Sequence, residues 1–240
     1  MTSPAHTVQE ADALAPPLPA ASRASAHAEA ARYTLLRRLA PSMRHHLVVN
    51  LQPIGMIYEV MDRRLRAAEP KLAEVHDSAQ KINGFARAAL QSSLDMVTWL
   101  APEEGATITA SDGVKECLSL LATSFTFRGY ALRNQVAPVE GQVGKAAMRN
   151  VLAGALMHLT DEHPAPAEIE LLAQAGDHGL VLTIRLRATA GEQGFSTAPA
   201  YRPLTRADFQ ALADAEGAQV LRDGEHALCI TLPWASPAVA

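Results

Sequence analysis

Apolar side chains recur at steps of three and four residues along two stretches in the first half of the chain, which is the spacing of one face of an α-helix. The first stretch runs from about Glu29 to Ala68 and ends at Glu69-Pro70, because proline cannot continue a helix and disfavours helical geometry just before it. The second runs from Leu72 to Leu100 and is followed by Ala101-Pro102. The repeating positions are Leu36, Leu39, Met43, Leu47, Asn50, Ile54, Ile57, Met61 and Leu65, and then Leu72, Val75, Ala79, Ile82, Ala86, Ala89, Ser93, Val97 and Leu100.

Two long helices joined by a short connection predict an antiparallel hairpin. A single hairpin with one apolar stripe on each helix leaves much of that stripe uncovered. Two copies packed as a four-helix bundle cover it, so we expect residues 29–104 to form a dimerisation domain and the protein to be a homodimer. Asn50 lies on the stripe, where it either sets the register of the bundle or lies at its edge.

Beyond about residue 106, short strands alternate with helices, which predicts an α+β fold with one mixed sheet and helices on one face. Thr205 with Asp208 has the form of a capping box at the start of the last helix. Asp223-Gly224 is typical of the turn in a closing hairpin. The expected strands are 107–109, 131–136, 168–173, 180–187, 219–221 and 227–232, and the expected helices are 111–128, 144–160 and 205–216.

Composition and charge narrow the possible partners. Residues 1–28 are rich in Ala, Pro and Ser and contain few large apolar side chains, so we expect a flexible tail. A net charge of −4 provides no basic patch, which argues against a nucleic-acid partner. No apolar run approaches the roughly 18 residues of a membrane span, and the N-terminus does not have the pattern of a signal peptide. We therefore expect a cytoplasmic protein that does not enter a membrane.

Metal ligation is not indicated by the sequence. Cys117 and Cys229 lie far apart and outside any CxxC pattern, so neither a zinc site nor a disulfide framework is expected. His158, Asp161 and His163 follow one another at spacings that are not specific for metal ligands, and no fourth ligand accompanies them. These three residues are interpreted as a polar helix terminus.

The segment Arg44–Leu51, which reads RHHLVVNL, resembles the phosphoacceptor box of the histidine kinases. In that box a His is followed by an acid, an apolar residue, Arg or Asn, a variable position, Pro and Leu. His45 matches the phosphoacceptor, and Leu47 and Leu51 match the apolar positions. The departures are His46 in place of the acid, Val48 in place of the polar residue and Asn50 in place of the proline.

A second segment, Asn150–His158, resembles the nucleotide-binding helix motif N-L-L-x-N-A-x-K-H of the same family. Gly154 stands in place of the magnesium-holding Asn, and Met157 in place of Lys. The strand that should lead into D-x-G-x-G, whose Asp reads adenine, leads instead into Arg187-Ala188-Thr189-Ala190-Gly191, and no Gly-rich lid follows. The matching positions are Asn150, Leu152, Ala155 and His158, and the closing segments Glu216–Ala218 and Cys229–Pro233 also resemble the family.

Together these segments cover about residues 30 to 235. They imply a degenerate histidine kinase core, in which the hairpin is followed by an α/β sandwich of the ATPase type over residues 105–240. The resemblance implies that ATP binding is lost, and no cofactor is expected.

Helical geometry gives an independent view of the two histidines. At roughly 100° per residue, His45 lies about 180° around the helix from Leu36, so its side chain points away from the apolar stripe. A phosphoacceptor needs such access, although an exposed His is also an ordinary surface residue. His46 stands where an acid–base group would assist, or is an incidental neighbour.

Three hypotheses follow from the resemblance. In the first, the protein passes phosphate to or from response-regulator receiver domains through His45, without ATP. In the second, it is a non-catalytic pseudokinase scaffold that binds a response regulator. In the third, it is an active histidine kinase, which the missing ATP-binding elements disfavour.

Overall fold

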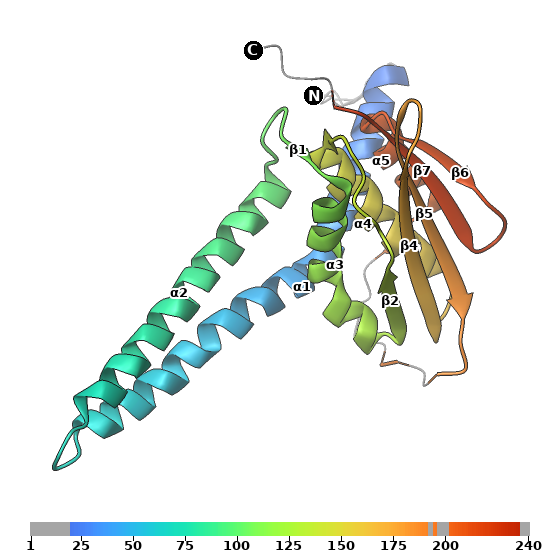
Figure 1. The fold of residues 1–240 in the computed structure, drawn as a ribbon. Helices are drawn as coiled ribbons and strands as arrows, with labels where there is room; N and C mark the ends of the chain where they lie inside the picture. Colours follow the sequence, from blue (N-terminus) through green and yellow to red (C-terminus); the bar gives the residue numbers. More distant parts are fainter. Residues whose placement is uncertain (1–19, 192–193, 196–201, 236–240) are drawn as a thin grey trace, which may run out of the picture.

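Two long helices form an antiparallel hairpin that projects from an α/β sandwich (Figure 1). The computed structural model describes residues 20–191, 194–195 and 202–235. Helix α1 spans Ala20–Leu65 and α2 spans Leu72–Leu100. The predicted α+β fold, with a helical hairpin followed by a mixed sheet, is confirmed. In the described part of the chain, no helix combines the length and hydrophobicity needed to cross a bilayer.

The expected start of the first helix was wrong. Helix α1 begins at Ala20, so residues 20–28, which were expected to belong to a flexible tail, are helical; residues 1–19 lie outside the described part. This segment is rich in Ala, which has the highest helix propensity, and Ala28 is already buried. Helix α1 then continues through Pro41 and Pro53, although each proline removes one intrahelical hydrogen bond.

The sandwich places its helices on one face of a five-stranded mixed sheet (Figure 1). The sheet order is β2-β4-β5-β7-β6, with β2 and β4 parallel and every other neighbouring pair antiparallel. Burial alternates along the central strands, because their apolar side chains point toward the helices. The elements are α3 Ala110–Phe127, β2 Tyr130–Asn134, α4 Lys145–Glu162, β4 Ala167–Ala175, β5 Gly179–Ala188, α5 Arg206–Ala215, β6 Gln219–Arg222 and β7 Ala227–Pro233.

A second, two-stranded sheet was not predicted. Strand β1 (Thr107–Ile108) pairs antiparallel with β3 (Val143–Gly144), and Lys145 N donates to Ala106 O at 2.8 Å beside them. Two residues are too few to show an alternating pattern, so sequence periodicity cannot reveal β3. The capping box at the start of α5 was predicted correctly: Asp208 N donates to Thr205 Oγ1, and Thr205 N donates to Asp208 Oδ2.

Helix α1 contributes to two different packing units. Its upstream half places Leu35, Leu39 and Met43 in the same core as the sandwich helices and sheet. Its downstream half packs along α2, where Asn50 Nδ2 donates to Ser92 Oγ at 3.1 Å. The hydrophobic core therefore crosses the expected domain boundary at residue 104, and the hairpin is an extension of a helix already built into the sandwich.

Replacing Leu39 with alanine is expected to lower the free energy of unfolding of the whole protein by about 2–5 kcal/mol, because a fully buried Leu leaves a cavity when truncated. Met56→Ala on the same helix is the control, since its side chain is 63% exposed. Urea denaturation followed by circular dichroism measures both. Equal, small losses in the two variants would show that the upstream half of α1 lies outside the cooperative core.

Candidate functional site

His45 lies where α1 leaves the sandwich. Met43, two positions earlier, is the last buried apolar residue that α1 gives to the core, and the His45 side chain is exposed, as the helical angle predicted. His46 is half-buried, and the two imidazole rings lie 6.4 Å apart between centroids at 80° to each other. The neighbouring histidines therefore face different surroundings.

His46 lines a cleft of roughly 290 Å³ at the junction of the hairpin and the sandwich, which we call the junction cleft. Its wall carries both signs of charge, with Asp95 on α2, Glu116 on α3 and Lys145 at the start of α4. The complete lining is Met43, His46, Ser92, Asp95, Met96, Trp99, Glu116, Ser119, Leu120 and Lys145. An imidazole in this position lies along a polar groove and is less exposed than that of His45.

One line of exposed apolar residues runs along α1 from His45 toward the hairpin tip. Val49, Met56 and Val60 follow His45 at steps of four, seven and four residues, which keeps all four side chains on one side of the helix. We call Val49, Met56 and Val60 the docking strip. Its position places an apolar surface directly beside an accessible imidazole.

A second apolar surface lies on the opposite side of the hairpin. Asn50 points toward α2, so Leu51, one residue later, is rotated by about 100° from that line, away from Val49. On α2, Leu90 likewise follows the buried Ala89 by one residue, and the same rotation on two antiparallel helices leads to the same side of the pair. The bundle face comprises the exposed residues Leu51, Tyr58, Leu65, Leu72, Leu90 and Val97.

The helix that resembles the nucleotide-binding motif is enclosed. Every residue of α4 from Ala147 to Thr160 is buried. A Cβ atom at Gly154 would meet Leu212 Cδ1 at 3.1 Å and Phe209 Cδ2 at 3.4 Å, so α5 packs directly against this position. A larger side chain at position 154 would therefore require Leu212 or Phe209 to move.

The matching polar residues of α4 also serve internal contacts. Asn150 Nδ2 donates to Glu216 Oε1 at 2.7 Å. The His158 ring stacks on Phe209 at 5.5 Å between centroids, and its Nδ1 lies 3.1 Å from Leu204 O. These three contacts connect α4 to α5, to its C-cap residue and to the segment that precedes α5.

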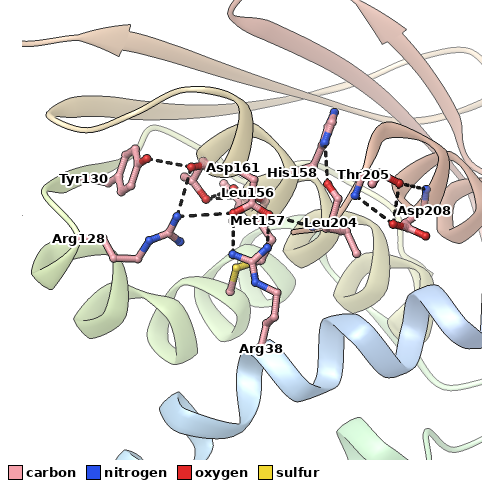
Figure 2. Close-up of polar contacts among 11 residues, drawn as sticks. Arg38, Arg128, Tyr130, Leu156, Met157, His158, Asp161, Leu204, Thr205 and Asp208 are labelled. Atoms are coloured by element: carbon pink, nitrogen blue, oxygen red, sulfur yellow. Dashed lines mark hydrogen bonds and ion pairs between the residues drawn. The ribbon is translucent and has the colours of Figure 1, made fainter. Parts of the chain in front are cut away.

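His158 and Asp161 turn toward different partners (Figure 2), and His163 turns toward a third. His158 faces Leu204 O, Asp161 faces Arg38, and the His163 ring packs against His226. Across the residues that the structure describes, no group of three or more His, Cys, Asp or Glu side chains converges as metal ligands do.

The contact between Arg38 and Asp161 was not anticipated from the sequence. Arg38 on α1 donates from both terminal nitrogens to the two oxygens of Asp161 in the last turn of α4, with Nη2 to Oδ1 at 2.7 Å (Figure 2). Leu204 N also donates to Asp161 Oδ2 at 2.9 Å, and Arg128 Nη2 lies 3.7 Å from Oδ1. Burial lowers the pKa of Arg128 and raises that of Tyr130, because both are drawn out of water at this junction.

A buried arginine, Arg149, joins α4 to the end of α2. Arg149 Nη1 donates to Thr98 O at 2.7 Å, and the guanidinium carbon lies 5.0 Å from the centre of the Trp99 ring. Its Nη2 donates to Glu116 on α3. No local sequence pattern indicates this contact, because it joins residues that are far apart along the chain.

No protein-family model matches this chain, and no curated protein matches it. Solved structures that resemble it include a bacterial phosphotransferase, with 14% sequence identity, a TM-score of 0.40, and coverage of 90% of this chain and 98% of the other. A histidine kinase from Burkholderia phymatum has 16% identity and a TM-score of 0.39, over 83% of this chain and 99% of its own. The histidine kinase ThkA in complex with the response regulator protein TrrA has 11% identity and a TM-score of 0.42, over 92% and 67%. At these distances no residue role is transferred to this chain.

Proposed function

We propose that this protein passes phosphoryl groups between response-regulator receiver domains through His45, without binding ATP. The observation that carries the proposal is the placement of His45 on a helix whose upstream half is part of the sandwich core. Because α1 itself ties the hairpin to the sandwich, the sandwich has no free linker on which to swing over His45. A phosphoryl donor must therefore approach from outside the molecule.

The chemistry requires only an accessible imidazole. The unprotonated ring nitrogen of His45 attacks the phosphorus of a receiver's aspartyl phosphate, forming an N–P bond while the acyl P–O bond breaks. The receiver aspartate leaves as a carboxylate, and the other ring nitrogen releases its proton to water. Transfer to a second receiver reverses these steps, so the phosphoryl group arrives already activated and no nucleotide is consumed.

The surfaces around His45 suit a protein partner. The docking strip provides apolar contact area on the same side of α1, and an exposed apolar strip beside polar groups is typical of an interaction site. The junction cleft, with Asp95, Glu116 and Lys145, adds charged groups that discriminate among partners. We propose that a receiver domain occupies the docking strip and that a second copy of this chain covers the bundle face.

The pseudokinase scaffold is the second candidate. It is favoured by the same docking strip and junction cleft, because binding at these surfaces needs no chemistry at His45. Mixing the protein with phosphorylated receiver domains tests the choice between the two. Label should move from the receiver into the protein in an acid-labile form; binding of the receiver without transfer of label would favour the scaffold.

ATP is expected not to bind. Titration calorimetry with magnesium and ATP should show no heat of binding up to about 1 mM, because α5 packs directly on Gly154. Gly154→Asn is expected to destabilise the protein without creating affinity, since even its Cβ atom meets Leu212 at 3.1 Å. A magnesium-dependent dissociation constant in the low micromolar range would contradict this and return the active kinase to first place.

A further inference from the structure

Both long helices contact α4 through an arginine, the part-buried Arg38 on α1 and the buried Arg149 on α4. In the last turn of α4, Asp161 accepts hydrogen bonds from both terminal nitrogens of Arg38 on α1 (Figure 2). In the first half of α4, Arg149 donates a hydrogen bond to Thr98 O and lies over the Trp99 ring, both at the end of α2. We call these two contacts the junction clamps.

The junction clamps are better suited to select one geometry than to add stability. The side chains of Arg38 and Asp161 are only 10% and 12% exposed, and that of Arg149 is 3% exposed. Removing charges from water costs about as much as their attraction returns, so a buried pair contributes little net stability. The pair nevertheless restricts the distance and orientation between α1 and α4, because a bidentate contact forms in only one relative orientation of the two side chains.

The position of Asp161 on its helix is a second indication that the junction clamps select one geometry. An acidic side chain in the last turn of a helix is disfavoured by the helix dipole. Here Arg38, Arg128 and the backbone N–H of Leu204 offset that cost, and each of them comes from a different element or segment. Asp161 therefore depends on α1 being correctly placed over the end of α4.

We propose that Arg38 and Arg149 are positioning residues, which hold the hairpin at one angle to the sandwich so that the docking strip and the junction cleft form a single preformed surface. The inference that the angle is fixed does not depend on the proposed function. Only the use of that surface by a receiver domain rests on the proposed function. If the angle between the hairpin and the sandwich varies, the docking strip and the junction cleft are correctly oriented in only a fraction of the molecules. The apparent affinity for the receiver domain then falls in proportion to that fraction.

Pulsed electron paramagnetic resonance measures the angle directly. Spin labels at Glu69→Cys on the hairpin tip and Gln174→Cys on β4 report the distance between the two parts, with Cys229→Ser as background. Cys117 stays unlabelled because it is buried and burial raises the pKa of its thiol. Mixing with an excess of unlabelled chain restricts the signal to pairs within one protomer.

We expect one narrow distance distribution for the otherwise unaltered labelled protein and a broad or shifted one for Arg38→Gln combined with Arg149→Gln. Circular dichroism and the unfolding midpoint of the double glutamine variant separate a released angle from a loss of folding. Lys81→Gln is the matched control, because Lys81 pairs with Asp77 on the surface of α2, away from the junction. A narrow, unshifted distribution in the double glutamine variant would overturn the proposal.

Kinetics then connects the angle to the reaction. The double glutamine variant should raise the KM for a phosphorylated receiver about tenfold, if the competent orientation falls to about a tenth, and leave kcat nearly unchanged. A lowered kcat at unchanged KM would overturn the positioning role. If His45→Ala leaves transfer intact, the proposed function fails, while the distance distributions still decide whether the clamps hold the angle.

Discussion

His45→Ala is expected to abolish phosphotransfer, lowering its rate by at least about a thousandfold, whereas His46→Ala retains most of it. The reason is access. The His45 side chain is exposed, while His46 is half-buried in the wall of the junction cleft. The nucleophilic nitrogen must approach the receiver's phosphorus in line with the bond that breaks, which an imidazole inside the cleft does not allow.

The measurement follows radiolabel from a phosphorylated receiver into each purified variant, with the folded state checked by circular dichroism. The product should lose its label in acid and keep it in base, as a phosphoramidate does and a phosphoserine does not. If His46→Ala abolishes transfer and His45→Ala does not, the register of the phosphoacceptor box is displaced by one residue. If neither variant loses transfer and the receiver still binds, the scaffold function gives the better account.

Much of the hairpin could be predicted because its helices are amphipathic over many turns. Helix α2 begins at Leu72 and ends at Leu100 as expected, since prolines flank both ends of the pattern. The start of α1 could not be predicted in the same way. Its first turns consist mainly of alanine and serine, which show little contrast between a buried and an exposed face, and composition alone indicated a tail.

The accessibility of His45 could be predicted from its angle on the helix, but its surroundings could not. The junction cleft is formed by four helices, and the presence of Glu116 and Lys145 in the same cleft as His46 depends on how α1 crosses the sandwich. The ion pair between Arg38 and Asp161 has the same origin. A single arginine on a helix has no local signature that separates a surface residue from one half of a buried pair.

The hairpin also presents two exposed apolar surfaces where the sequence showed one stripe. Of the predicted stripe, the line through Asn50 lies between the two helices of one chain, with Asn50 donating to Ser92, whereas Leu65, Leu72 and Val97 are exposed on the bundle face. The docking strip and the bundle face lie on either side of that line. The two surfaces can be told apart only when it is known which residues point toward the neighbouring helix, and the sequence alone does not give this.

Leu90→Asp is therefore expected to convert the protein from a dimer to a folded monomer. Leu90 is 62% exposed in the single chain, so the substitution leaves the protomer's own core intact. In a four-helix bundle the same carboxylate would be buried without a partner, which costs several kcal/mol on each side of a symmetric interface. Dissociation should be complete at micromolar concentration, measured as a halved mass in light scattering.

Met56→Asp is the matched control, because Met56 is 63% exposed but lies on the docking strip, across the hairpin from Leu90. It should remain a dimer and lose affinity for the receiver domain, whereas Leu90→Asp loses the dimer and keeps the surface beside His45. A reversal of these two effects would exchange the assignments of the two faces. A monomeric mass for the unaltered protein would refute the homodimer itself, since no second copy would then be needed to cover Leu51, Leu90 and Val97.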